Sequence, residues 1–267
     1  MRFLLIDAFA NRPFAGNPAA VVLLEHAASD VLLQSLAMEF NQAETAYVSP
    51  RDDGAFDLRW FTPLREVALC GHATLAAARA LREWGLVETS GIVRFITREG
   101  GELRCTFQAD QIVMDFPATP PAPVGLPASV EVVLGVAGPV QCIGKTTMNL
   151  TLRLPDRRQV ESARPDFRAL SSWHPIGVTI TAPGGRPGVD FVARFFAPAA
   201  GIDEDPVTGS AHCALAVYWA AELQKTQFAA QQLSRRGGEL GVWLIGDRVQ
   251  LSGKSIITVR GTIDAMD

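Results

Sequence analysis

The sequence GHATLAAA at residues 71–78 has a counterpart in GSAHCALA at residues 209–216. Both octapeptides begin with glycine and carry alanine at their third and sixth places, and they start 138 positions apart (209 minus 71), about half of the 267-residue chain. Each continues as a segment of about four helical turns that is apolar on nearly every side. A helix of this kind must be buried on all sides, so we expect strands to surround it.

Most of the remaining chain has the pattern of short strands. Runs rich in β-branched and aromatic residues, bounded by turn signals, occur at residues 3–9, 19–24, 45–48, 56–61, 92–97, 103–108 and 112–116. Residues 30–40 have apolar side chains at helical spacing and predict one amphipathic helix. Two similar α+β lobes, each a curved mixed sheet around a central helix, accommodate both the repeat and the buried helices.

A proline-rich segment near the middle of the chain predicts where these lobes meet. Five prolines lie between residues 117 and 127, and neither a helix interior nor a central strand tolerates them. We therefore expect an N-terminal lobe at residues 1–117 and a C-terminal lobe at residues 118–253. A C-terminal strand at about residues 254–267 is expected to complete the N-terminal lobe.

The composition is that of an ordinary folded protein and excludes several classes of partner. Hydrophobic residues make up 48% and charged residues 19%, 24 Lys and Arg stand against 28 Asp and Glu, and no basic run exceeds two residues. Nucleic acid is therefore not expected as a partner. The first apolar run ends at Asp7 and no 18 apolar residues run together, so we expect a cytoplasmic protein with no membrane partner.

The cysteines and one short motif argue against metal and nucleotide sites. Cysteines at positions 70, 105, 142 and 213 include no C-x-x-C pair, which disfavours a disulfide scaffold and structural zinc. His212 and Cys213 are neighbours on a predicted helix and would point about 100° apart, so we do not expect them to bind a metal ion together. The GKT at residues 144–146 lacks the glycine that a phosphate-binding loop needs at position 139, where proline stands.

Both predicted buried helices begin with glycine followed by a polar residue, after the strand-like residues 67–70 or the acidic turn at residues 203–208. The first N–H groups of a helix have no partner within the helix and carry partial positive charge. If the halves face each other, the two helix starts would form one site for a carboxylate or an enolate. The glycines could equally serve only to permit tight turns.

Several groups that titrate lie near these turns: His72, Glu204, Asp205 and, at the start of a short strand, Glu44. Glu44 is flanked by alanine and leads an apolar strand; it is either an exposed surface carboxylate or a half-buried group suited to general acid/base chemistry. Asp205 could also be only a turn residue that favours the start of the following helix.

Four blocks of the sequence together resemble the PhzF-like (phenazine biosynthesis) isomerase family. In family order they are IDAF with RPFAGNP at residues 6–9 and 12–18, AET at residues 43–45, CGHAT at residues 70–74, and EDPVTGSA at residues 204–211. The resemblance spans most of the chain and implies the diaminopimelate epimerase fold, with two similar lobes and an active site between them. One departure is Ala43, where family members often have serine, which argues against the phenazine-pathway substrate itself.

The resemblance also implies roles for individual residues. Glu44 matches the general acid/base that removes a proton from one carbon of a small unsaturated amino or hydroxy acid and returns one to another. His72 and Asp205 match residues that bind polar groups of the substrate and assist proton transfer. The residues that match the carboxylate-binding positions are Gly71, Gly209 and Ser210. No cofactor is implied, and a homodimer is expected because the family is commonly dimeric.

Related epimerases use one cysteine from each lobe, because inversion needs a base on each face of the carbon. Cys70 stands at the first of these places, but Thr208 stands at the second. A threonine hydroxyl is too weak an acid to replace a thiol. Single-base isomerisation is therefore expected, with a carboxylate-binding protein that lacks turnover, or an epimerase that uses Cys70, as the alternatives.

Overall fold

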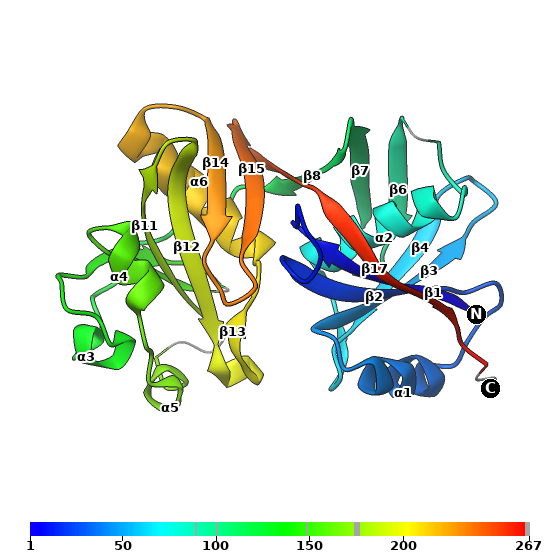
Figure 1. Cartoon of the computed structure of the whole chain (residues 1–267), viewed down its shortest axis with the longest axis horizontal. Coiled ribbons are helices and arrows are strands. Elements are labelled where there is room, and N and C mark those ends of the chain that lie inside the picture. The colour runs from blue at the N-terminus through cyan, green and yellow to red at the C-terminus, as the bar shows by residue number, and fades with distance from the viewer. Residues whose placement is uncertain (89, 100, 148, 174–176, 265–267) are drawn as a thin grey trace. The chain divides into compact units, whose positions relative to one another are not determined.

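The structure, a computed structural model, describes residues 1–88, 90–99, 101–147, 149–173 and 177–264. The chain divides into two compact units: unit 1 comprises residues Met1–Asp115 and Ser252–Asp267, and unit 2 comprises Phe116–Leu251. Figure 1 shows that each unit combines a sheet with a long helix among its strands, α2 in unit 1 and α6 in unit 2. The predicted α+β class is confirmed.

Unit 1 contains a mixed sheet built largely from the first half of the chain. Its elements are β1 (Arg2–Ala8), β2 (Asn17–Leu23), α1 (Asp30–Phe40), β3 (Glu44–Pro50), β4 (Phe56–Phe61), β5 (Glu66–Val67), α2 (Gly71–Glu83), β6 (Ile92–Ile96), β7 (Glu102–Gln108), β8 (Gln111–Pro117) and β17 (Ser255–Thr262). The predicted helix has the bounds of α1, and each strand predicted in this half lies within two residues of an observed one.

The strands of unit 1 pair in both directions. β1 is antiparallel to β17 and to β2, β2 is parallel to β3, and β3 is antiparallel to β4. β4 is antiparallel to β5 and parallel to β6, and β6, β7 and β8 follow as antiparallel neighbours. Helix α2 packs against β1, β2, β3 and β17. Nine of its thirteen residues are buried, five of them alanines, which allow strands to approach the helix closely.

Unit 2 is organised around α6. Its elements are α3 (Val130–Leu134), β9 (Gln141–Lys145), β10 (Leu150–Arg153), α4 (Arg157–Ser162), α5 (Phe167–Leu170), β11 (Val178–Arg186), β12 (Val189–Ala197), η1 (Pro198–Ala200), β13 (Ile202–Asp205), α6 (Gly209–Leu223), β14 (Gln227–Gln232), β15 (Gly238–Ile245) and β16 (Arg248–Gly253). β10 with β11 and β12 with β14 are parallel, whereas β9 with β10, β11 with β12, and β14 with β15 are antiparallel.

Two details differ from the sequence-based expectation. Residues Ile202–Asp205 form strand β13 instead of an acidic turn, because this segment pairs with β12. Before α2, strand β5 ends at Val67, so residues 68–70 approach the helix without regular structure. Among the described residues, none of the helices is long and apolar enough to span a membrane.

The side of α6 that packs inside unit 2 carries aromatic contacts and one buried imidazole. Phe191 stacks on Trp219 with ring centroids 5.6 Å apart, and the Trp219 indole donates to Thr181 Oγ1 at 3.1 Å. His212 is fully buried and donates from Nδ1 to the carbonyl of Thr208 at 2.9 Å. Its Nε2 has no hydrogen-bond partner among the described residues. Burial lowers the pKa of His212 to about 4.

Replacement of His212 by glutamine is expected to make the free energy of unfolding depend less on pH in the acidic range. Between pH values of about 6.5 and about 4 the unfolded chain binds a proton at His212 that the folded chain does not. This stabilisation is present above about pH 6.5 and decreases as the pH falls toward 4, by roughly 3 kcal/mol in total. Urea unfolding of both proteins across this range measures the difference.

The exposed His26 supplies the matched control for this measurement. A His26→Gln variant should keep the pH dependence of the wild-type protein. If His212→Gln keeps the wild-type slope between about pH 6.5 and about pH 4, His212 is not held neutral by burial in the folded state.

Candidate active site

Glu44 lies where helix α1 has ended and strand β3 begins. Asn41 caps α1 in the left-handed conformation, and the chain then enters β3, where Glu44 pairs in register with Ala19 of the parallel strand β2. The Glu44 side chain is 15% exposed. Glu44 is therefore not an exposed surface carboxylate, which was one of the two interpretations of the sequence.

The partner of Glu44 is His72, the second residue of α2. Because α2 is enclosed by strands, its first turn brings His72 against the start of β3. Nε2 of His72 lies 3.1 Å from Oε2 of Glu44, and His72 is itself buried. The two residues are 28 positions apart in the sequence (72 minus 44), and the fold brings them into hydrogen-bond contact.

Asn17, the first residue of β2, lies on the other side of the imidazole. Asn17 is fully buried, and its Nδ2 lies 3.1 Å from Nδ1 of His72. When this amide donates to Nδ1, that nitrogen acts as the acceptor and the ring proton of neutral His72 lies on Nε2, facing Glu44. Asn17 thus favours the tautomer in which His72 donates to the carboxylate.

Cys70, the residue before α2, completes this cluster. Its Sγ lies 3.4 Å from Nδ1 and 4.0 Å from Nε2 of His72. Burial and the charge of Glu44 raise the pKa of the Cys70 thiol, so the thiol keeps its proton near neutral pH. Burial by itself lowers the pKa of His72, but the interactions of His72 with Cys70 and with the Glu44 carboxylate outweigh burial, and the pKa of His72 lies well above its ordinary value.

Glu44, Cys70 and His72 also offer three potential metal ligands whose donor atoms lie within 4.8 Å of one another. Glu44 faces Nε2 of the imidazole, however, whereas Cys70 lies closer to Nδ1. The contact between Nε2 and Oε2 has the length of a hydrogen bond, so the cluster is compatible with acid/base chemistry as well as with metal ligation.

The remaining predicted site residues lie in unit 2, where β13 leads into α6. Asp205 is the last residue of β13, and the hydroxyl of Thr208 donates to its carboxylate. Thr208 is the N-cap of α6, but its side chain forms no capping hydrogen bond to the helix. Gly209 and Ser210 are the first two residues of α6, as Gly71 is the first residue of α2.

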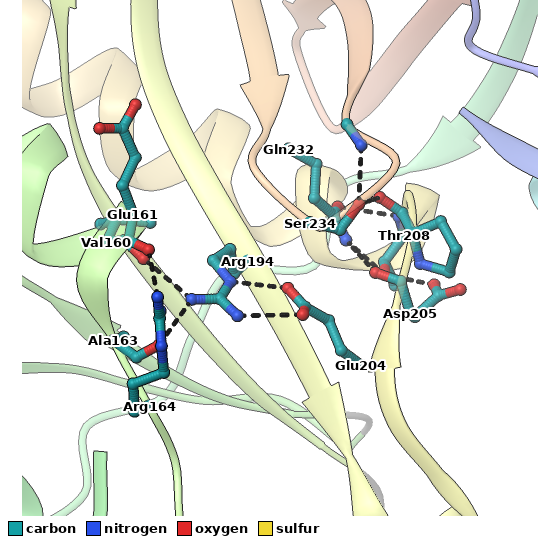
Figure 2. A network of polar contacts seen from close by, with 12 residues as sticks. Val160, Glu161, Ala163, Arg164, Arg194, Glu204, Asp205, Thr208, Gln232 and Ser234 are labelled. Atoms are coloured by element: carbon teal, nitrogen blue, oxygen red, sulfur yellow. Dashed lines mark hydrogen bonds and ion pairs between the residues drawn. The ribbon is translucent and has the colours of Figure 1, made fainter. Parts of the chain in front are cut away.

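Glu204 is committed to a structural ion pair. Figure 2 shows both oxygens of its carboxylate paired with the guanidinium of Arg194, at 2.6 Å and 3.0 Å. Arg194 is buried and also donates to the carbonyls of Val160 and Ala163. A carboxylate held in this bidentate way anchors β13 and is not free to exchange protons with a ligand.

Three site-forming residues were not identified from the sequence: Asn17, Arg194 and Gln232. Asn17 lies in the GNP segment, but no local pattern indicates that its amide meets an imidazole. Gln232 could have been found, because β14 alternates and the buried positions Phe228 and Ala230 place Gln232 on the same buried face. A buried amide requires hydrogen-bond partners.

Comparison with known proteins identifies the relationship. The family model PhzC-PhzF, described as phenazine biosynthesis-like protein, matches residues 6–261. The chain belongs to the PhzC-PhzF family. A Pseudomonas aeruginosa protein named an uncharacterized isomerase is 48% identical, with 98% of each chain covered. The crystal structure of a PhzF-family protein from Enterococcus faecalis superposes with a TM-score of 0.90 at 36% identity, covering 97% of each chain.

More distant structures share the fold alone. A probable proline racemase from Agrobacterium radiobacter superposes with a TM-score of 0.63 at 12% identity, covering all of this chain and 93% of its own. This agrees with the epimerase-like architecture expected from the sequence. As a PhzC-PhzF protein whose relatives include named isomerases, the chain is an isomerase.

In this PhzC-PhzF protein the predicted residues fall into two groups. Glu44, His72 and Gly71 lie in unit 1, and the first two are in direct contact. Asp205, Gly209 and Ser210 lie in unit 2, within six consecutive residues. A Cβ atom added at Gly209 would lie 3.4 Å from the Cδ1 atom of Leu251, which is an ordinary van der Waals contact.

Substitution of Gly209 by valine is expected to weaken binding of a small carboxylate more than it lowers stability. The local space tolerates a Cβ, whereas branched methyl groups would cover the first N–H groups of α6. We expect at least a roughly tenfold loss of affinity for anthranilate by calorimetry, with the free energy of unfolding changed by about 1 kcal/mol or less. Ala229→Val, at an exposed position of β14, is the control; unaltered affinity in Gly209→Val would contradict the expectation.

Proposed function

We propose that this isomerase moves a proton between two carbons of a small unsaturated amino or hydroxy carboxylic acid, with Glu44 as its single general acid/base. The observation that carries the proposal is the contact between the Glu44 carboxylate and Nε2 of His72 in a largely buried setting. A carboxylate so placed can take a proton from a carbon next to a carboxyl group and return it to another carbon.

His72 and Asn17 support this chemistry. The imidazole donates to Glu44, and Asn17 backs its other nitrogen, so the carboxylate has a fixed orientation before substrate arrives. A proton that Glu44 takes from substrate then stays on the Glu44 carboxyl group until the second carbon accepts it.

The proposal assigns contacts with the substrate to Asp205, Gly209 and Ser210 in unit 2 and to Gly71 in unit 1. The first N–H groups of a helix favour a carboxylate or the enolate that proton removal creates. Thr208 donates its hydroxyl hydrogen to the carboxylate of Asp205. That hydrogen is therefore not available for transfer to the substrate. Single-base isomerisation is favoured for this reason over two-base racemisation.

Two further expectations stay proposals. The lobe boundaries at residues 1–117 and 118–253 are supported by the division of the chain into units of 1–115 with 252–267, and 116–251. A homodimer is supported by the family resemblance.

Glu44→Gln is expected to abolish proton transfer while leaving ligand binding nearly intact. Removal of a general acid/base costs about 10² to 10⁴ in rate, whereas glutamine preserves the size and hydrogen bonding of the side chain. The measurement follows deuterium incorporation by NMR in heavy water, with 2,3-dihydro-3-hydroxyanthranilate and a panel of small unsaturated amino and hydroxy acids as substrates.

The exposed Glu39 of α1 offers a matched control, because Glu39→Gln removes a carboxylate close by in the sequence. That variant should exchange deuterium at the wild-type rate. Activity that survives in Glu44→Gln would remove Glu44 from its proposed role. A wild-type protein that binds members of the panel without exchange would favour a carboxylate-binding protein.

Cys70→Ser separates isomerisation by Glu44 from epimerisation by Cys70. Because Cys70 keeps its proton and is buried, we expect the rate to stay within about tenfold of wild type, well short of the loss from removing a base. Cys142→Ser, at a partly buried position, is the control. A loss as large as that in Glu44→Gln would assign the chemistry to Cys70.

A further inference from the structure

Gln232 is a fully buried polar residue at the end of strand β14. The strand alternates between exposed and buried positions, and Gln232 shares the buried face with Phe228 and Ala230. An amide removed from water must satisfy its donors and its acceptor within the protein, because each unsatisfied group is costly. The partners of Gln232 therefore indicate why a polar residue occupies this position.

All of those partners belong to the segment between β13 and α6. Oε1 of Gln232 accepts from the backbone N–H of Thr208 at 2.9 Å. Nε2 donates to the carbonyl of Asp205 at 2.8 Å and to Oγ1 of Thr208 at 3.2 Å. Because a backbone N–H only donates and a carbonyl only accepts, these two contacts fix which end of the amide is which.

The orientation of Gln232 also directs the hydroxyl of Thr208. Since Nε2 donates to Thr208 Oγ1, the hydroxyl uses its own hydrogen toward the carboxylate of Asp205. Figure 2 shows this chain of contacts from Gln232 through Thr208 to Asp205. The carboxylate proposed to contact substrate is thus oriented through Thr208 by an amide that lies outside its own segment.

The turn after β14 adds a second attachment to the same segment. Ser234 donates from Oγ to the carbonyl of Pro206 at 2.9 Å, and the N–H of Gly237 donates to Ser234 Oγ at 3.1 Å. Residues 205–208 are therefore held at their first, second and last positions by the end of β14 and the turn that follows. Gly209 and Ser210 follow Thr208 directly as the first two residues of α6, so their positions depend on that of Thr208.

We propose that Gln232 is a positioning residue of the isomerase: its amide sets the direction of the Asp205 carboxylate and the place of the first N–H groups of α6. The inference rests on the proposed function for the role of Asp205, but the positioning itself is a property of unit 2. A purely structural amide would contribute to stability alone. A positioning amide also controls the segment's local order and the catalytic rate.

Gln232→Met tests this distinction, because methionine keeps the length of the side chain and removes every hydrogen bond. We expect hydrogen exchange at the amide of Thr208, which donates to Oε1 of Gln232, to accelerate by about tenfold or more. We expect kcat to fall by about 10², the effect of misplacing a reacting group by about 1 Å.

Two controls define what a structural effect alone would do. Thr181→Val removes a buried hydroxyl of unit 2 that accepts from Trp219 and donates to the Val192 carbonyl, away from residues 205–210. Gln231→Met makes the same substitution one position earlier, at a residue on the other face of β14. Both should leave amide exchange at Thr208 unchanged, and neither should reduce kcat as Gln232→Met does.

Gln232→Glu provides a rescue that depends on pH. A neutral carboxylic acid keeps the acceptor and one of the two donors of the amide, whereas a carboxylate beside the Asp205 carbonyl and the Thr208 hydroxyl presents only acceptors. Burial raises the pKa of such an introduced carboxyl group. The ratio of Gln232→Glu activity to wild-type activity should therefore rise as the pH falls, while the ratio for Gln232→Met should stay level.

The outcomes separate this inference from the proposed function. Faster amide exchange at Thr208 that is confined to the Gln232 variants supports positioning, whether or not a substrate is found. A wild-type protein that exchanges deuterium into none of the substrates contradicts the proposed function instead. Amide exchange at Thr208 in Gln232→Met that matches wild type overturns the inference. A kcat loss no greater than that of Thr181→Val, or a Gln232→Glu ratio that does not vary with pH, overturns it as well.

Discussion

The enclosure of the apolar part of helix α2 is the constraint on which the rest of unit 1 depends. Nine of the thirteen residues of α2 are buried, and its charged residues Arg79, Arg82 and Glu83 lie in its second half, so β1, β2, β3 and β17 cover the remainder. The end of such a helix is where polar groups can gather, because its first N–H groups have no internal partners. His72 lies in that first turn, and the same packing that hides the alanines of α2 brings its imidazole to Glu44.

The sequence predicted the elements better than it predicted the contacts between them. The apolar helices, the α+β class and the bounds of α1 and β4 follow from periodicity, which is a local property. The pairing of Glu44 with His72 depends on the parallel register of β2 and β3 and on the depth at which α2 sits. No local pattern carries that information. The family resemblance named both residues without stating that they touch.

The contacts of buried polar residues in unit 2 could not be predicted from local sequence patterns either. Arg194 and Gln232 are both buried, and each is satisfied by groups at least ten positions away. Arg194 holds Glu204 through charge, and an unpaired charge at that depth would be strongly destabilising. Gln232 holds Asp205 and Thr208 through neutral hydrogen bonds, so it orients the segment without adding charge next to the Asp205 carboxylate. Neighbouring residues of β13 are thus fixed by two different kinds of interaction.

Strand β17 gives the chain an unusual order of assembly. It pairs along β1, and Thr258 donates to the carbonyl of Leu5, 253 positions earlier. During synthesis from the N-terminus, β1 and the strands that follow it emerge long before β17 exists, whereas every residue of unit 2 precedes it. Most of unit 2 therefore emerges before the strand that unit 1 lacks. Until β17 is available, the edge of β1 that it covers is unpaired, and an unpaired strand edge favours misassociation.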